Sequence, residues 1–74
     1  MKYNEILKYL DCNVECYKKG LYTIPELLHV IEKDIRMETN YIYDTDKRIA
    51  RENKLYKHAF KRIITAIDYL EKHG

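Results

Sequence analysis

Two cysteines and three histidines are the side chains of this 74-residue chain best suited to bind a metal ion. Cys12 and Cys16 lie about one helical turn apart, so their thiolates could share a metal ion with His29 or His58. A structural zinc site normally needs a second paired motif, and the sequence has none. We therefore interpret both cysteines as small, half-buried side chains of a reduced protein. The sequence predicts no metal site and no cofactor.

Catalysis is poorly supported by the same residues. The chain contains no serine, and a Cys–His pair would need a cleft that a chain of this length hardly provides. Asp44-Thr45-Asp46 resembles a calcium-binding loop only in its first three residues, because the glycine and the closing glutamate of such a loop are absent. We predict no catalytic residues and a protein that is not an enzyme.

The strongest signal is a cluster of positive charge, with seven Lys/Arg and one acid in residues 47–62. At about 100° per residue of helix, most of these cations fall on one stripe. The stripe consists of Lys47, Arg48, Arg51, Lys54, His58, Lys61 and Arg62. Residues 1–46 have a net charge of −3 and residues 47–74 a net charge of +5, although the whole chain carries only +2. This separation predicts a positive face that can meet an anionic partner.

Three interpretations of the basic stripe remain open. It can be the solvated side of an amphipathic helix, a surface that binds nucleic-acid phosphates, or a face that docks on an acidic protein surface. A DNA-reading helix-turn-helix needs a tight turn before its second helix, and residues 40–46 do not supply one. Docking on a protein is therefore the leading interpretation, and nucleic-acid binding is the alternative.

Tyrosine is the second unusual feature, with eight in the chain. Tyrosine is enriched at the energetic centres of protein interfaces, although it also fills the rims of small cores. Tyr41 and Tyr43 flank Ile42 beside a predicted break between helices, where core packing poorly explains an apolar triplet. We predict that Tyr41 and Tyr43 belong to the partner-binding surface.

Three helices, at about residues 2–18, 24–40 and 46–72, account for almost the whole chain. The first has a stripe of apolar residues spaced three and four apart and ends at Gly20, a typical helix stop. Thr23 and Glu26 form a capping box that begins the second. Asp44 or Thr45 can cap the third. The fold class is therefore all-α, a single domain forming a small antiparallel three-helix bundle with a long C-terminal helix.

The third helix is predicted to be much longer than the first. Its expected core stripe consists of Ile49, Tyr56, Phe60, Ile63, Ile67 and Leu70. Since the first helix is too short to cover this stripe, either the second helix or a second copy of the chain must cover the end near the loop. A homodimer, or a purely structural homo-oligomer, is a further alternative.

The remaining predictions concern location and function. The chain has no apolar run long enough for a transmembrane helix and no signal-peptide pattern, which predicts the cytoplasm of the producing cell or of an infected host and no membrane partner. Residues encoded by A/T-rich codons hint at a bacterial or viral genome. We expect a small regulator or inhibitor of a protein partner with an acidic surface. The predicted contact residues are Arg48, Arg51, Lys54, His58, Lys61, Arg62, Tyr41 and Tyr43.

Overall fold

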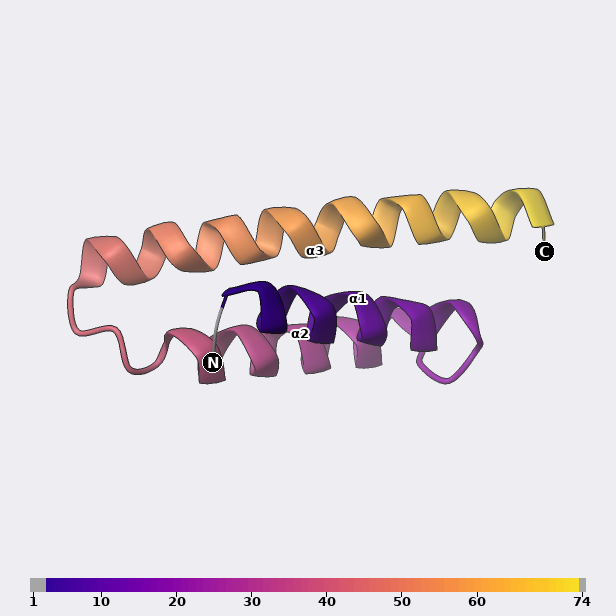
Figure 1. Ribbon diagram of the computed structural model, residues 1–74. Coiled ribbons are helices and arrows are strands. Elements are labelled where there is room, and N and C mark those ends of the chain that lie inside the picture. The colour runs from indigo at the N-terminus through magenta and orange to yellow at the C-terminus, as the bar shows by residue number, and fades with distance from the viewer. Residues whose placement is uncertain (1–2, 74) are drawn as a thin grey trace.

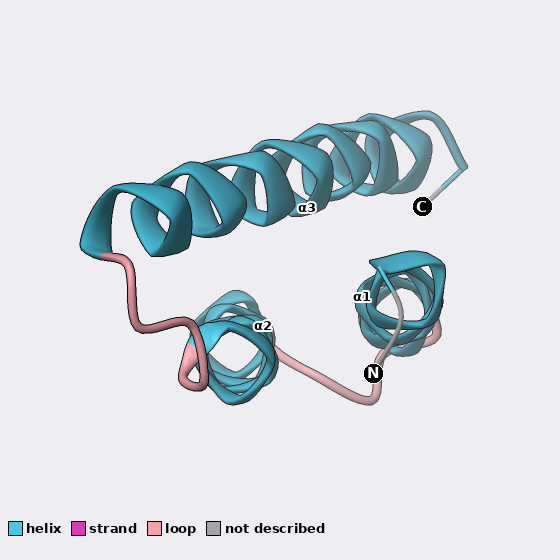
Figure 2. Cartoon of the chain, turned by 60° about the vertical axis from the view of Figure 1, so that its left-hand side comes forward, coloured by secondary structure: helices cyan, strands magenta, loops and turns pink. Residues whose placement is uncertain are grey.

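The computed structural model describes residues 3–73, in which three α-helices pack against one another. These are α1 (Tyr3–Lys18), α2 (Ile24–Thr39) and α3 (Thr45–His73). Successive helices run in opposite directions, and α1 and α2 lie side by side against α3 (Figures 1 and 2). The all-α three-helix bundle predicted from the sequence is confirmed. Lys2, near which the first helix is predicted to begin, lies outside the described residues.

The end of α1 is determined by Gly20. This glycine has a φ of +82°, a left-handed conformation that costs glycine little because it has no Cβ. The Leu21 amide donates to the Cys16 carbonyl at 2.9 Å, and the Gly20 amide donates to the Tyr17 carbonyl at 3.0 Å. These two bonds form a Schellman motif, which reverses the chain toward α2.

Side chains cap the beginnings of α2 and α3. The Glu26 amide donates to the Thr23 hydroxyl at 3.4 Å, and the Thr23 amide donates to Glu26 Oε1 at 3.1 Å, which completes the predicted capping box. The bond from the Thr23 amide lowers the pKa of Glu26 because it favours the ionised carboxylate. At α3, the Lys47 amide donates to Asp44 Oδ1 at 3.1 Å. Asp44 is therefore the side chain that caps α3.

The core is built from short apolar stripes on all three helices. Its buried members are Ile6, Leu10 and Val14 of α1, Leu27, Ile31 and Ile35 of α2, and Leu55, Ala59, Ile63 and Ala66 of α3. Buried Thr39 ends α2, and its hydroxyl lies 2.9 Å from the Ile35 carbonyl oxygen and 3.1 Å from Glu52 Oε1. This contact ties the end of α2 to α3.

The predicted core stripe of α3 is only partly correct, because Ile63 is in the core and Tyr56 and Ile67 pack against it but the stripe is displaced around the helix. Of its six residues only Ile63 is fully buried, while Ile49 and Phe60 are exposed. The buried face is instead centred on Leu55, Ala59, Ile63 and Ala66. Ala59 and Ala66 explain the difference, since small side chains allow helices to approach closely, whereas the prediction counted only large apolar residues.

The length of α3 leaves one of its ends only partly covered. It contains 29 residues against 16 in each of the other helices, and it runs past both ends of the α1–α2 pair (Figure 1). Leu55 is buried, so neighbouring helices of the same chain cover that part of the predicted overhang, but Ile49 stays exposed. Within residues 3–73, no helix is long and apolar enough to cross a membrane.

Candidate functional site

The predicted basic stripe of α3 does not face away from the bundle. It lies along the flank of α3 next to α1, because the buried alanine face brings that flank toward the first helix. Four of its residues interact with α1 side chains. The stripe is therefore partly an internal contact between two helices.

Tyr3 accounts for the first of these contacts. The Arg51 guanidinium carbon lies 4.9 Å from the centre of the Tyr3 ring, and Lys54 Nζ lies 5.5 Å from it. Both distances are within the range of a cation–π interaction, in which the electron-rich face of the ring attracts the cation. Arg51 and Lys54 therefore help to hold the beginning of α1 against α3.

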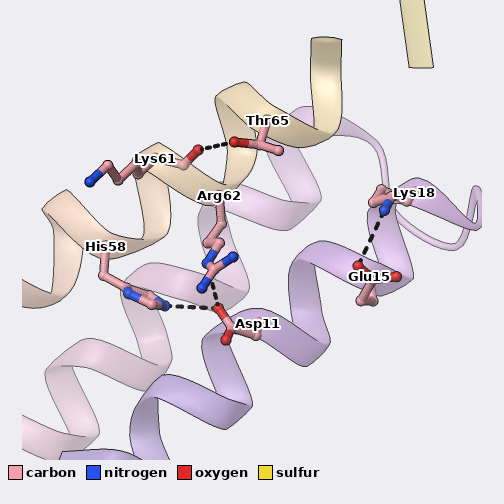
Figure 3. A network of polar contacts seen from close by, with 7 residues as sticks. All are labelled: Asp11, Glu15, Lys18, His58, Lys61, Arg62 and Thr65. Atoms are coloured by element: carbon pink, nitrogen blue, oxygen red, sulfur yellow. Dashed lines mark hydrogen bonds and ion pairs between the residues drawn. The ribbon is translucent and has the colours of Figure 1, made fainter. Parts of the chain in front are cut away.

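Asp11 accounts for the second contact. Its Oδ1 lies 2.8 Å from His58 Nε2 and 3.5 Å from Arg62 Nε, so one carboxylate serves two side chains of α3 (Figure 3). The neighbouring Lys61 points its ammonium away from this cluster, while its backbone carbonyl accepts a hydrogen bond from the Thr65 hydroxyl at 3.0 Å. Of these three basic residues, only Lys61 points away from Asp11.

The remaining predicted contact residues lie apart from one another. Arg48 is half-buried and lines a shallow surface between the end of α2 and the beginning of α3, together with Arg36 and Glu52. The side chain of Tyr43 is 100% exposed. Tyr41 lines a pocket with residues of α1 and α2 and none of α3. The structure therefore does not bring the predicted basic and tyrosine residues together on a single patch.

Part of the apolar stripe expected in the core of α3 is exposed, and the sequence interpretation left out Ile64 beside it. Ile49, Phe60 and Ile64 are 48%, 47% and 67% exposed, respectively. The Tyr56 and Phe60 ring centres lie 5.7 Å apart, which extends the stripe toward the core. Ile64 could have indicated this exposed stripe in the sequence, because it is a large apolar residue that belongs neither to the expected core stripe nor to the basic stripe. The outward side of α3 is thus partly apolar.

Exposed lysines border this apolar stripe. Lys57 and Lys61 are both exposed, and helical spacing of three or four residues places them beside Phe60 and Ile64. We call these four residues together with Ile49 the outward face of α3. It combines large apolar groups with positive charge on a helix whose other side is fixed in the core.

Tyr56 marks the boundary between the outward face and α2. Partial burial raises the pKa of the Tyr56 phenol, and the negative charge of Glu32 on α2 raises it further. Arg36 acts in the opposite direction and Glu52 adds a smaller rise. The phenol is therefore kept neutral in an environment that disfavours its anion.

The described residues offer little material for metal or acid–base chemistry. Across residues 3–73, no three His, Cys, Asp or Glu side chains gather closely enough to hold a metal ion. Cys12 is exposed, Cys16 is half-buried, and both are free thiols. His29 is exposed on α2 and takes no part in the Asp11–His58 contact between α1 and α3.

Comparison with known proteins does not add to this picture, since no family model, no curated protein and no solved structure matches the chain.

Proposed function

We propose that this chain is a small, non-enzymatic regulator or inhibitor that binds a protein partner through the outward face of α3. The observation that carries the proposal is the side-by-side exposure of Phe60 and Ile64 with Lys57 and Lys61. Large apolar side chains left in solvent on a small domain are typical of a surface that binds another molecule. The partner that fits is a protein with an apolar groove bordered by acidic side chains.

The two kinds of residue have different roles in the proposal. Phe60 and Ile64 supply most of the affinity, since large side chains that become fully desolvated dominate interface energies. Lys57 and Lys61 increase the association rate and orient the encounter, because complementary charge acts mainly on these properties. Tyr43, which is fully exposed near the end of the α2–α3 connection, can extend the contact toward the beginning of α3.

Affinity capture with quantitative mass spectrometry tests the proposal. We expect proteins captured by the wild-type chain to be lost when Phe60 and Ile64 are both changed to Ser, and also when Lys57 and Lys61 are both changed to Glu. The matched control is a Lys19→Glu, Lys33→Glu double variant, which makes the same change in net charge at exposed positions of other elements. The proposal is wrong if all four baits capture the same proteins in the same amounts.

Self-association is a second candidate function, because the same exposed stripe could be covered by another copy of the chain. Light scattering at several protein concentrations separates this candidate from binding to a different protein. A dimer that becomes monomeric on Phe60→Lys would support self-association, and a wild-type monomer at all concentrations would exclude it.

Nucleic-acid binding, the alternative predicted from the sequence, has weaker support. Arg51, Lys54, His58 and Arg62 have partners on α1, which leaves fewer cations for phosphates. A gel-shift titration at two salt concentrations tests it, since phosphate binding weakens steeply as salt increases. No shift at low salt would remove this alternative.

A further inference from the structure

A pocket of about 330 Å³ lies between α1 and the end of α2, and none of its lining residues comes from α3. It is lined by Ile6, Tyr9, Asp34, Met37, Glu38 and Tyr41. Because α1 and α2 lie side by side beneath α3 (Figure 2), this pocket opens on a different side of the bundle from the outward face of α3. An inference drawn from it therefore does not depend on the proposed function.

Glu38 is the unusual residue of the pocket. Its side chain belongs to the buried part of the molecule, with only 5% of the residue exposed, and its Oε1 is buried without a hydrogen-bond partner. A buried carboxylate oxygen with no donor is costly, because it has lost its water without gaining a replacement. Such a group is expected to find a donor, and a small shift of the Glu38 side chain toward the adjoining pocket would let a ligand there supply one.

The other lining residues favour a cation as that ligand. Asp34 adds a second carboxylate, whose Oδ2 accepts a hydrogen bond from Asn13 Nδ2 at 2.6 Å and is thereby held in place. Tyr9 and Tyr41 are both exposed aromatic residues on the rim, and aromatic ring faces attract cations. None of the six lining residues is basic. The pocket therefore combines negative charge, aromatic rings and an unsatisfied acceptor.

We propose that this pocket binds an arginine side chain presented by a partner protein. A guanidinium is planar, donates several hydrogen bonds in a fixed geometry, and stacks on aromatic rings, so it can meet the Glu38 carboxylate and a tyrosine ring together. An ammonium group is more strongly hydrated and makes less use of the flat aromatic rim. A metal ion fits poorly, since no three suitable ligands gather among the described residues.

A second copy of the chain is a weaker source of this arginine, because three of the four arginines already have a partner within their own chain. Arg36 pairs with Glu32 at 2.9 Å, Arg51 lies over the Tyr3 ring, and Arg62 approaches Asp11. Arg48 is half-buried between α2 and α3. A different protein is therefore the source that the proposal assigns to the arginine.

An NMR titration of the isotope-labelled chain with N-acetyl-arginine amide tests the inference. We expect amide shifts confined to residues around Tyr9 and Glu38, with a dissociation constant on the order of 1 mM for a single side chain. Binding of N-acetyl-lysine amide is expected to be weaker. Equal binding of the lysine probe, or no shifts in the pocket with either probe, would overturn the proposal.

Matched variants make the same titration specific. Glu38→Gln keeps the shape of the side chain but removes its charge, and we expect binding to weaken roughly tenfold or more. Tyr9→Ala changes an exposed residue, so it tests the aromatic rim without disturbing the core. Glu71→Gln, an equal loss of charge at an exposed position of α3, is expected to bind as the wild type does. Unchanged binding by both pocket variants would overturn the proposal.

A final titration adds the unlabelled chain to the labelled one, which tests the source of the arginine. Pocket shifts that grow with the concentration of the chain itself would overturn the assignment to a partner protein. The expected result is no change at Tyr9, Glu38 and their neighbours over the concentration range used for the arginine probe.

Discussion

Asp11 Oδ1 lies 2.8 Å from His58 Nε2, which joins α1 to α3 across 47 residues of sequence. The same oxygen lies 3.5 Å from Arg62 Nε. His58 and Arg62 were both predicted to contact a partner, and the structure places both beside an acid of their own chain. The acidic first half of the chain and the basic last helix therefore contact each other within one molecule, at Asp11.

This relationship predicts a modest, salt-dependent contribution of Asp11 to stability. Asp11→Asn is expected to lower the free energy of unfolding by up to about 1 kcal/mol, because both ion pairs are partly exposed to solvent. Urea unfolding of Asp11→Asn, His58→Gln and the double variant would give the coupling energy directly. As a control, Asp68→Asn removes an exposed pair with Lys72 within one helix and should cost only about 0.3–0.5 kcal/mol. Zero coupling at low salt would contradict the prediction.

The capping box at α2 gives a second prediction. Thr23→Ala removes the hydroxyl that accepts from the Glu26 amide, and we expect a loss of about 1 kcal/mol in the free energy of unfolding. Thr65→Ala is the control, because the hydroxyl of exposed Thr65 bonds to the Lys61 carbonyl within α3 and does not cap a helix. Its expected effect is near zero, since alanine is the better helix former. Equal losses in thermal melts of the two variants would count against the capping role.

The same box predicts a dependence on acid pH. The pKa of Glu26 is lowered in the folded state by the bond from the Thr23 amide, so its contribution to stability is present above the unfolded pKa. That contribution is lost as the pH falls through the lowered folded pKa. Glu26→Gln is therefore expected to show a smaller loss of stability on acidification than the wild type, measured by urea unfolding at a series of pH values. Parallel curves for the two proteins would show that the carboxylate charge does not matter.

Glu38 predicts a conflict between stability and binding. Because its buried Oε1 has no partner, Glu38→Met should raise the free energy of unfolding by about 1–3 kcal/mol while it abolishes arginine binding. Glu71→Met, at an exposed position, is the control and should change stability by no more than about 0.5 kcal/mol. A strong destabilisation by Glu38→Met in chemical unfolding would instead assign the carboxylate a structural role.

How far the sequence predicts the fold differs between the helices. Most of the α1 and α2 core was predictable, because large apolar residues at helical spacing are buried at positions such as Leu10, Ile31 and Ile35, although Leu28 and Met37 are exposed. The α3 face was not, because Ala59 and Ala66 carry too little hydrophobic area to dominate a periodicity pattern. They are nevertheless buried between the helices, where a small side chain lets neighbouring helices pack closely.

The candidate site was predictable in its element but not in its face. Residues 47–62 place most of the positive charge of the chain on α3, but helical spacing alone does not say which side of that helix meets α1. The Tyr3 and Asp11 contacts depend on that orientation. The Glu38 pocket is formed by residues of two helices and a loop, so the residue spacing within any one helix does not predict it.

The orientation of α3 leads to the last prediction, which compares two adjacent residues. Ala59 is completely buried and Phe60 is about half exposed, the reverse of what their sizes suggest. Ala59→Leu should therefore cost about 1–3 kcal/mol of unfolding free energy by overpacking the core. Phe60→Ala should stay within about 1 kcal/mol of the wild type in a monomeric bundle, because it removes a surface group. Denaturant unfolding of both variants at low protein concentration checks this prediction. If α3 turned its large apolar stripe toward the core, Phe60→Ala would be the more destabilising of the two variants. A large loss of stability for Phe60→Ala that grows with protein concentration would identify a dimer built on the outward face.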